Sequence, residues 1–200
     1  MKIYTQNQIE ETVIALKNHN SVALPTDTVY GLAVQYGDLN DLAYLKKLKD
    51  RDANKPIPFM VNTVEMMETI AQVDERTKKI VDTFLPGALT LVLPVLPSLD
   101  RTYTNGKDTI AIRIPDEPFI LQVIEKLKTP LLVSSANQSG QPAALSVEQV
   151  QEQLPDVDVI VSGQCARQQA STIVDCTKEE LVILREGPIS LEELNISLKK

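Results

Sequence analysis

Hydrophobic residues recur at helical and at strand spacing in turn along the chain, a pattern typical of an α/β protein. Helical spacing predicts helices over residues 7–18, 42–48, 64–71, 74–84, 117–128 and 146–154, and a short helix near residue 190. Short apolar runs predict strands over 21–24, 57–61, 89–93, 109–114, 131–133, 157–161, 172–175 and 181–184. Because 172–175 and 181–184 are close enough to form a hairpin, we expect one twisted mixed sheet flanked by helices, in a single domain of residues 1–200.

The overall charge is acidic, with 20 Lys and Arg against 27 Asp and Glu and a net charge of −7. This balance argues against a protein that binds nucleic acid through its overall charge, but it leaves room for a local basic pocket. The chain has 2 cysteines and 1 histidine, which excludes a disulfide framework and a histidine-rich metal site. His19, between two asparagines, is typical of a solvated helix end rather than of a catalytic triad.

Targeting signals are missing from the sequence. The first residues lack the apolar stretch of a signal peptide, and no apolar run approaches the roughly 20 residues of a membrane span. We therefore expect a cytoplasmic protein that does not enter membranes.

Four polar segments follow predicted strands or helices, where ligands of α/β proteins bind. Residues 25–32 hold two threonines, an aspartate and a tyrosine, which suit either a ligand loop or a capped turn. Residues 47–56 bring Lys49, Arg51 and Lys55 to the end of a helix, which suits either a polyphosphate or plain solvation. Lys49 and Arg51 would share one face of an extended loop.

The other two segments carry a buried arginine and a hydroxyl-rich loop. Period-two alternation over 109–114 places three isoleucines on one face and Thr109 and Arg113 on the other. Such an arginine needs either an internal salt bridge or a ligand anion. Residues 131–140 run from an apolar strand into Ser135, Asn137 and a glycine, a pattern that favours ligand binding over a plain turn.

Seven motifs in order resemble the YrdC family of L-threonylcarbamoyladenylate synthases. They read PTDTVYGLA, KDRDANKP, PGALTLVL, TIAIRIP, PLLVSSANQSGQP, ASTIVD and LREG, and the resemblance covers about residues 8–195. The resemblance implies an α/β fold with a large concave cavity. The implied reaction converts L-threonine, bicarbonate and ATP, with Mg²⁺, into L-threonylcarbamoyl-AMP and pyrophosphate. An enzyme that catalyses this reaction is a nucleotidyltransferase. Its product would serve threonylcarbamoyladenosine modification of tRNA by separate transferase proteins.

The resemblance also implies roles for individual residues. Thr26, Arg113 and Ser171 would bind threonine, with Arg113 on its carboxylate. Lys49, Arg51, Lys55, Thr109, Ser135, Asn137 and Arg185 would bind the nucleotide, and Lys49, Arg51 and Arg113 would be catalytic. No metal-ligating residue is implied.

Departures from the family pattern affect a few positions. Asp27 replaces a frequent glutamate and Ala33 a glycine, while Asp52 and Glu186 replace prolines. The turn over 163–170 is not glycine-rich, and its Arg167 would add a cation.

Two other functions fit the same residues. One is an RNA-binding or ribosome-maturation factor of the same fold without catalysis, which the acidic charge disfavours. The other is a paralogue that uses another acyl or carbamoyl substrate with a nucleotide.

Overall fold

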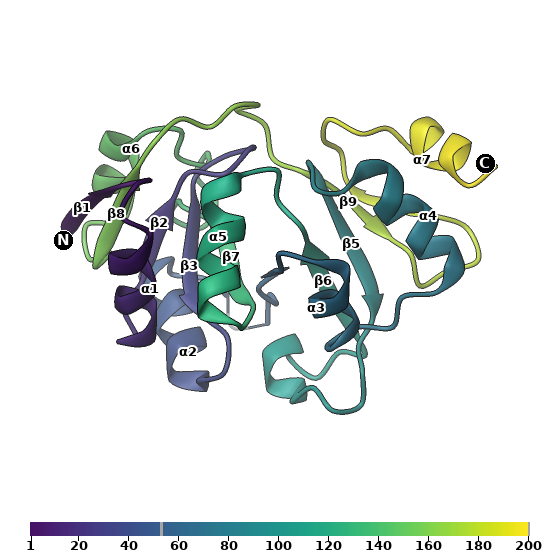
Figure 1. Ribbon diagram of the computed structural model, residues 1–200, viewed down its shortest axis with the longest axis horizontal. Helices are drawn as coiled ribbons and strands as arrows, with labels where there is room; N and C mark the ends of the chain where they lie inside the picture. Colours follow the sequence, from purple (N-terminus) through teal and green to yellow (C-terminus); the bar gives the residue numbers. More distant parts are fainter. Residues whose placement is uncertain (53, 200) are drawn as a thin grey trace.

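One mixed sheet runs the length of the molecule and twists along its long axis (Figure 1). The computed structural model describes residues 1–52 and 54–199, so residue 53 of the cationic segment 49–56 lies outside the described residues. The strand order is β1-β8-β2-β3-β7-β4-β6-β5-β9-β10. The strands are β1 (Lys2–Thr5), β2 (Val22–Leu24), β3 (Gly31–Gln35), β4 (Phe59–Met60), β5 (Leu89–Pro94), β6 (Thr109–Arg113), β7 (Leu131–Ser135), β8 (Val159–Ser162), β9 (Thr172–Asp175) and β10 (Val182–Arg185).

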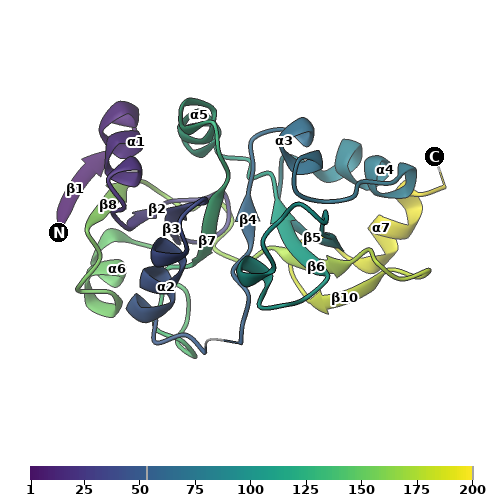
Figure 2. The same cartoon turned by 90° about the horizontal axis from the view of Figure 1, so that it is seen from below.

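Helices flank both faces of this sheet. They are α1 (Ile9–Lys17), α2 (Leu39–Leu48), α3 (Val64–Glu68), α4 (Glu75–Phe84), α5 (Pro118–Leu127), α6 (Val147–Gln153) and α7 (Leu191–Ser197), with a 3₁₀ turn η1 (Arg101–Thr104). At the N-terminal end of the sheet, α1 and α5 lie on one face and α2 and α6 on the other (Figure 2). The predicted α/β class, the mixed sheet and the β9–β10 hairpin are confirmed.

Several predicted boundaries were wrong, and each error has a local cause. The strand predicted over 57–61 is only the two residues of β4, because Pro56 and Pro58 cannot donate to a ladder. Strand β1 was not predicted, since it is a short edge strand whose side chains are mostly exposed. Strand β3 was not predicted because it is buried on both faces and begins with Gly31, so it shows no alternation of polar and apolar residues.

The two faces of β3 pack against different cores. Leu32 and Val34 join the larger apolar cluster, which also holds residues of α2, α3 and α4. Ala33 joins a smaller cluster formed with α1 and α5. Burying each large apolar side chain contributes about 1.5–3 kcal/mol, so both layers hold the central strands in register.

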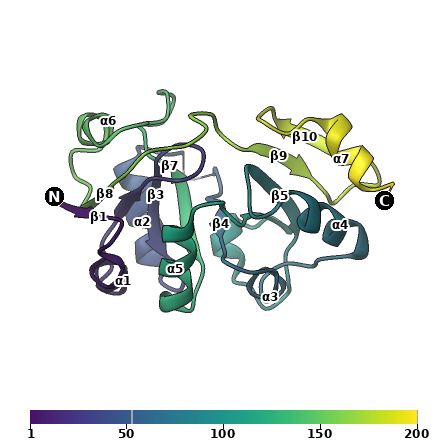
Figure 3. The ribbon, with the colours of Figure 1, turned by 45° about the horizontal axis from the view of Figure 1, so that its top comes forward.

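The sheet face that carries the smaller core continues from β4 to β6. Met60 of β4 belongs to the cluster under α5 and pairs with Arg113 of β6. Arg113 therefore lies on the sheet face that α1 and α5 cover further along. The chain between β8 and β9, residues 163–171, passes from one half of the sheet to the other (Figure 3). The described helices include none with the length and hydrophobicity that a bilayer crossing requires.

The histidine ties α1 to α2. His19 follows α1 with a φ of 62°, and its Nδ1 lies 3.0 Å from Oδ2 of Asp41 and 3.8 Å from Oδ2 of Asp38. The ring is largely exposed, as the sequence indicated, whereas Asp41 is buried. The hydrogen bond that Nδ1 donates to Asp41 and the charge of that carboxylate raise the pKa of His19 above 6.5.

We expect His19→Gln to lower the free energy of unfolding more under mildly acidic than under mildly basic conditions. A pKa raised in the folded state gives stabilisation that is fully present below the unfolded value, about 6.5, and is lost as the pH rises through the folded value. Urea denaturation of both proteins at about pH 5.5 and about pH 8.5 measures the difference. Lys17→Gln on the same helix end is the control, and equal effects of His19→Gln at both pH values would contradict the link.

Candidate active site

A cavity of about 400 Å³ opens over the centre of the sheet. This volume lies within the usual range of small-molecule sites. Its walls come from the loop before β3, the chain between α2 and β4, and strands β5, β6, β7, β9 and β10. The cavity matches the concave site that the sequence led us to expect.

Strand alternation decides which side chains enter the cavity. Along β6, Thr109, Ala111 and Arg113 line it, whereas Ile110 and Ile112 are buried in the larger core, as predicted. Thr90 follows the same rule on β5, where it stands between Leu89 and Leu91. Thr90 was not predicted to line a site, although its lone hydroxyl in the run LTLVL is a signal that could have indicated it.

The lining of the cavity is positively charged, although the protein as a whole is acidic. Its lining includes five cations, Arg51, Lys55, Lys107, Arg113 and Arg185, and no carboxylate among the described lining residues. The whole chain carries a net charge of −7, so the acidic surplus lies outside this lining. Low-dielectric walls with one sign of charge concentrate the opposite charge, so the cavity suits an anionic ligand.

Arg113 is held by an internal ion pair. Its Nη2 donates to both oxygens of Asp27, at 2.6 Å each, its Nη1 to Oγ1 of Thr28 at 2.9 Å and its Nε to the Gly87 carbonyl at 2.8 Å. Arg113 and Asp27 are 4% and 3% exposed. Of the two partners considered from the sequence, the structure therefore shows the salt bridge. Its predicted role toward a threonine carboxylate stays a prediction.

Thr26 organises the loop before β3. Its Oγ1 accepts hydrogen bonds from the amides of Thr28 and Val29, at 3.0 and 3.2 Å, and donates to the Val29 carbonyl at 2.7 Å. This is the capped turn that residues 25–32 allowed. Thr26 also lines the cavity, so its contact with threonine stays a prediction.

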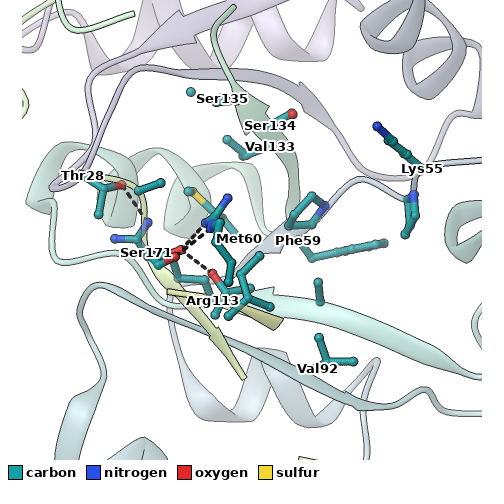
Figure 4. A pocket seen from close by; sticks show the side chains of 18 of the residues that line it. Thr28, Lys55, Phe59, Met60, Val92, Arg113, Val133, Ser134, Ser135 and Ser171 are labelled. Atoms are coloured by element: carbon teal, nitrogen blue, oxygen red, sulfur yellow. Dashed lines mark hydrogen bonds between the residues drawn. The ribbon is translucent and has the colours of Figure 1, made fainter. Parts of the chain in front are cut away.

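Ser171 lies at the same end of the cavity as Thr28 and Arg113, opposite Lys55 (Figure 4). Arg185 contacts Ser171 there. Nη2 of Arg185 donates to the Ser171 hydroxyl at 3.0 Å and its Nε to the Ser171 carbonyl at 3.0 Å. The Ser171 and Thr90 hydroxyls are 2.8 Å apart. The resemblance assigns Ser171 to threonine and Arg185 to the nucleotide, but in the structure the two side chains are in direct contact.

Lys49 does not enter the cavity, contrary to the expectation that it shares a face with Arg51. Residues 49–51 are not extended, since Lys49 ends α2 in a helical conformation and Asp50 has a φ of 47°. The Lys49 ammonium donates instead to the carbonyls of Ser135 and Asn137 and to the Asn137 side chain. Burial and the charge of Arg51 lower the pKa of Lys49 to about 7.

Asn137 also lies behind the cavity wall. Its Nδ2 donates to the carbonyls of Gln138 and Gln141, at 2.9 and 2.6 Å, and its Oδ1 accepts from the Ser135 hydroxyl at 2.5 Å. Lys49 and Asn137 thus support the loop that presents Ser135, and their direct contact with a nucleotide stays a prediction.

Arg51 and Lys55 do line the cavity. Nη2 of Arg51 donates to the Pro56 carbonyl at 3.1 Å, and its Nη1 lies 3.5 Å from the Ser134 hydroxyl. Lys55 is exposed. Lys107 also lines the cavity and is exposed, but it was not predicted from the sequence. It stands two residues before Thr109, so its place in front of the strand is the signal that could have indicated it.

The turn over 163–170 is anchored beside this site. The Tyr30 hydroxyl donates to the Gly163 carbonyl at 3.0 Å and accepts from the Gly163 amide at 3.1 Å. Burial raises the pKa of Tyr30 to about 12. The Arg167 amide donates to the Asp27 carbonyl at 3.1 Å, while its side chain is exposed and is not part of the lining, so the extra cation expected from the sequence does not line the cavity.

Gly187, the glycine of the LREG motif, lies against the backbone of residues 170–172. A Cβ at this position would lie 2.3 Å from the Thr172 amide nitrogen, 2.7 Å from the Ser171 carbonyl carbon and 2.8 Å from the Ala170 carbonyl oxygen. All three atoms are backbone, so they cannot move aside as a flexible side chain can. The close approach fixes the segment that carries Ser171.

Comparison with known proteins agrees with the geometry. The Sua5/YciO/YrdC family model, described as "Telomere recombination", matches residues 14–187. A Pyrococcus abyssi protein named threonylcarbamoyl-AMP synthase is 34% identical over 200 residues, covering 96% of this chain and 59% of that protein. A Bacillus subtilis protein of the same name is 31% identical over 191 residues, covering 94% and 55%. The chain thus spans less than two thirds of these two relatives.

A solved structure extends the comparison to three dimensions. The crystal structure of P. abyssi Sua5 complexed with L-threonine superposes with a TM-score of 0.93 at 32% identity, covering 98% of this chain and 61% of that one. The relative therefore shares the whole described architecture.

Replacing Arg113 by alanine should destabilise the protein by about 3–5 kcal/mol, because it leaves the Asp27 carboxylate buried without a counterion. Chemical denaturation of Arg113→Ala, Asp27→Asn and the double variant measures the change. We expect the double variant to lose less than the sum of the two single losses, whereas additive losses would contradict a direct pair.

Gly187→Ala should cost about 1–3 kcal/mol, because the methyl group must displace the backbone of residues 170–172. Thermal denaturation measures this loss, with Glu186→Ala at the exposed neighbouring position as the control. Equal melting temperatures for the two variants would show that the close approach is not required.

Proposed function

Because this chain belongs to the Sua5/YciO/YrdC family, we propose that it is a nucleotidyltransferase that makes threonylcarbamoyl-AMP and pyrophosphate from L-threonine, bicarbonate and ATP. The observation that carries the proposal is the cavity, with five cations, several hydroxyls and no acidic described residue in its lining. The names of the relatives point to the same product. All three substrates carry negative charge, which this lining would neutralise.

The reaction has three steps. Bicarbonate takes up a proton and loses water to give carbon dioxide. The neutral threonine amine attacks its carbon, forming the N–C bond of a carbamate and releasing a proton. A carbamate oxygen then attacks the α-phosphorus of ATP, and the bond to the pyrophosphate group breaks. Bicarbonate or a phosphate oxygen takes the proton, since no lining side chain is a carboxylate or a histidine among the described residues.

The protein's main contribution would be to bring anions together in a fixed geometry. Threonine would lie at the end formed by Thr26, Arg113 and Ser171, where Thr28 and Arg185 also present polar groups. Arg113, already neutralised by Asp27, would offer its remaining N–H hydrogen to the amino acid rather than a full positive charge. A hydroxyl partner at this end would distinguish threonine from valine.

The nucleotide would occupy the rest of the cavity. Arg51 and Lys55 would bind its phosphates, Thr109 and Ser135 would contact the nucleotide from β6 and β7, and Arg185 would border it. Lys49 and Asn137 would act by holding the Ser135 loop in place. The catalytic residues would thus be Arg51 and Arg113, with Lys49 acting through the Ser135 loop.

Mg²⁺ enters the proposal with ATP, as part of the substrate. Protein-held Mg²⁺ usually has one or two carboxylate ligands, and the described residues of the lining supply none. We therefore expect ATP phosphates and water to hold the ion.

The product would serve threonylcarbamoyladenosine formation in tRNA by separate transferase proteins, which this protein would contact only transiently. Direct tRNA binding would be weak or absent, because a net charge of −7 opposes binding to a polyanion.

A product assay with ATP, bicarbonate and single amino acids tests the function. We expect pyrophosphate release and threonylcarbamoyl-AMP with threonine, and at least about a hundredfold lower kcat/KM with valine, because the site would leave a buried hydrogen-bonding group unpaired. Omission of bicarbonate is the control.

The outcome separates the rival functions. Turnover with another amino acid or acyl donor would favour a paralogue. Salt-dependent RNA binding without ATP turnover would favour the RNA-binding factor and would contradict the proposal.

A further inference from the structure

Lys107 lies in the cavity but belongs to none of the seven motifs. It stands between η1 and β6 and is exposed. Four other cations share the cavity, and two of them, Arg113 and Arg185, are held at the end with Thr28 and Ser171. Lys107 is the fifth cation of the lining, and no motif assigns it a role.

The Lys107 side chain lines the cavity together with those of Thr109 and Arg113. Thr109 of β6 pairs with Pro94, and the Val95 amide donates to the Asp108 carbonyl at 3.0 Å, so the chain is held to β5 just before β6 begins. The Asp108 side chain is 91% exposed and lies 3.4 Å from Arg101, and it is not part of the lining.

Hydrogen bonds fix the Lys107 backbone, whereas the residue is exposed. The Lys107 amide donates to the Thr104 carbonyl at 3.2 Å, and the buried Thr104 hydroxyl donates back to the Lys107 carbonyl at 2.7 Å. Gly106, with a φ of 77°, permits this tight turn. Nζ of Lys46 donates to Oδ1 of Asn105 at 2.8 Å, which ties the turn to α2.

Strand direction places Lys107 at the same end of the sheet as Lys55 and Arg51, and all three line the cavity. Strands β4 and β6 are parallel, with Met60 next to Arg113, so the residues that precede the two strands lie at the same end. Lys107 is six residues from Arg113, about 20 Å along an extended chain. Among residues 1–52 and 54–199, no salt bridge involves Lys107, Lys55 or Arg51.

We propose that Lys107 completes, with Lys55 and Arg51, a binding site for the pyrophosphate part of ATP and for the pyrophosphate that leaves. The inference rests on the proposed function for the identity of the ligand. None of the three cations forms a salt bridge in the described structure, so a polyphosphate would supply their close anionic partner. The exposure of both lysines suits a leaving group, because a departing anion must regain water.

Titration with inorganic pyrophosphate tests this site without turnover. We expect Lys107→Ala to weaken pyrophosphate binding, measured by calorimetry, about five- to tenfold, and Lys107→Arg to retain it. The difference should shrink at high salt, because exposed charges are screened. Lys17→Ala on α1 is the matched control, since it also removes one exposed lysine.

Each result decides one question. Unchanged binding in Lys107→Ala, or a loss equal to that in Lys17→Ala, would overturn the assignment, as would absence of pyrophosphate binding in the wild type. Circular dichroism of each variant excludes loss of fold as the cause. Lys107-dependent binding in a protein that makes no threonylcarbamoyl-AMP would leave this site standing and refute the proposed function.

Discussion

The buried pair between Asp27 and Arg113 is the contact on which the site depends. It joins the loop before β3 to the end of β6, and Arg113 also holds the Gly87 carbonyl before β5. Three segments far apart in sequence are therefore fixed at one point. The pair also spares the fold an uncompensated charge at the base of a cavity that is otherwise lined by cations, which would repel one another in the absence of a ligand.

The cavity has two ends of different character. At the Arg113 end, cations and hydroxyls are already engaged with protein partners, so the geometry is preorganised but the net field is modest. At the end near Lys55, cations lack carboxylate partners in the described structure and project from loops. A small polar ligand suits the first end and a highly charged one the second.

Much of this could be predicted from the sequence, because strand alternation is a local property. The three isoleucines of residues 109–114 predicted the orientation of Arg113 correctly, and the caps at Asp74 and Ser146 marked true helix starts. The partner of Arg113 could not be chosen, since Asp27 is 86 residues away and its approach depends on the sheet order. Lys49 was misplaced for a related reason, because a left-handed residue at Asp50 is not readable from composition alone.

The shared face of the sheet has a consequence for folding accuracy. One side of β6 packs into the larger core, and the other forms the floor of the cavity. If β6 slipped by one residue against β5, Arg113 would enter the apolar layer and the isoleucines would face solvent. Such a misaligned molecule would lose its core together with its site, so this arrangement leaves no stable population that is folded but inactive through a register error.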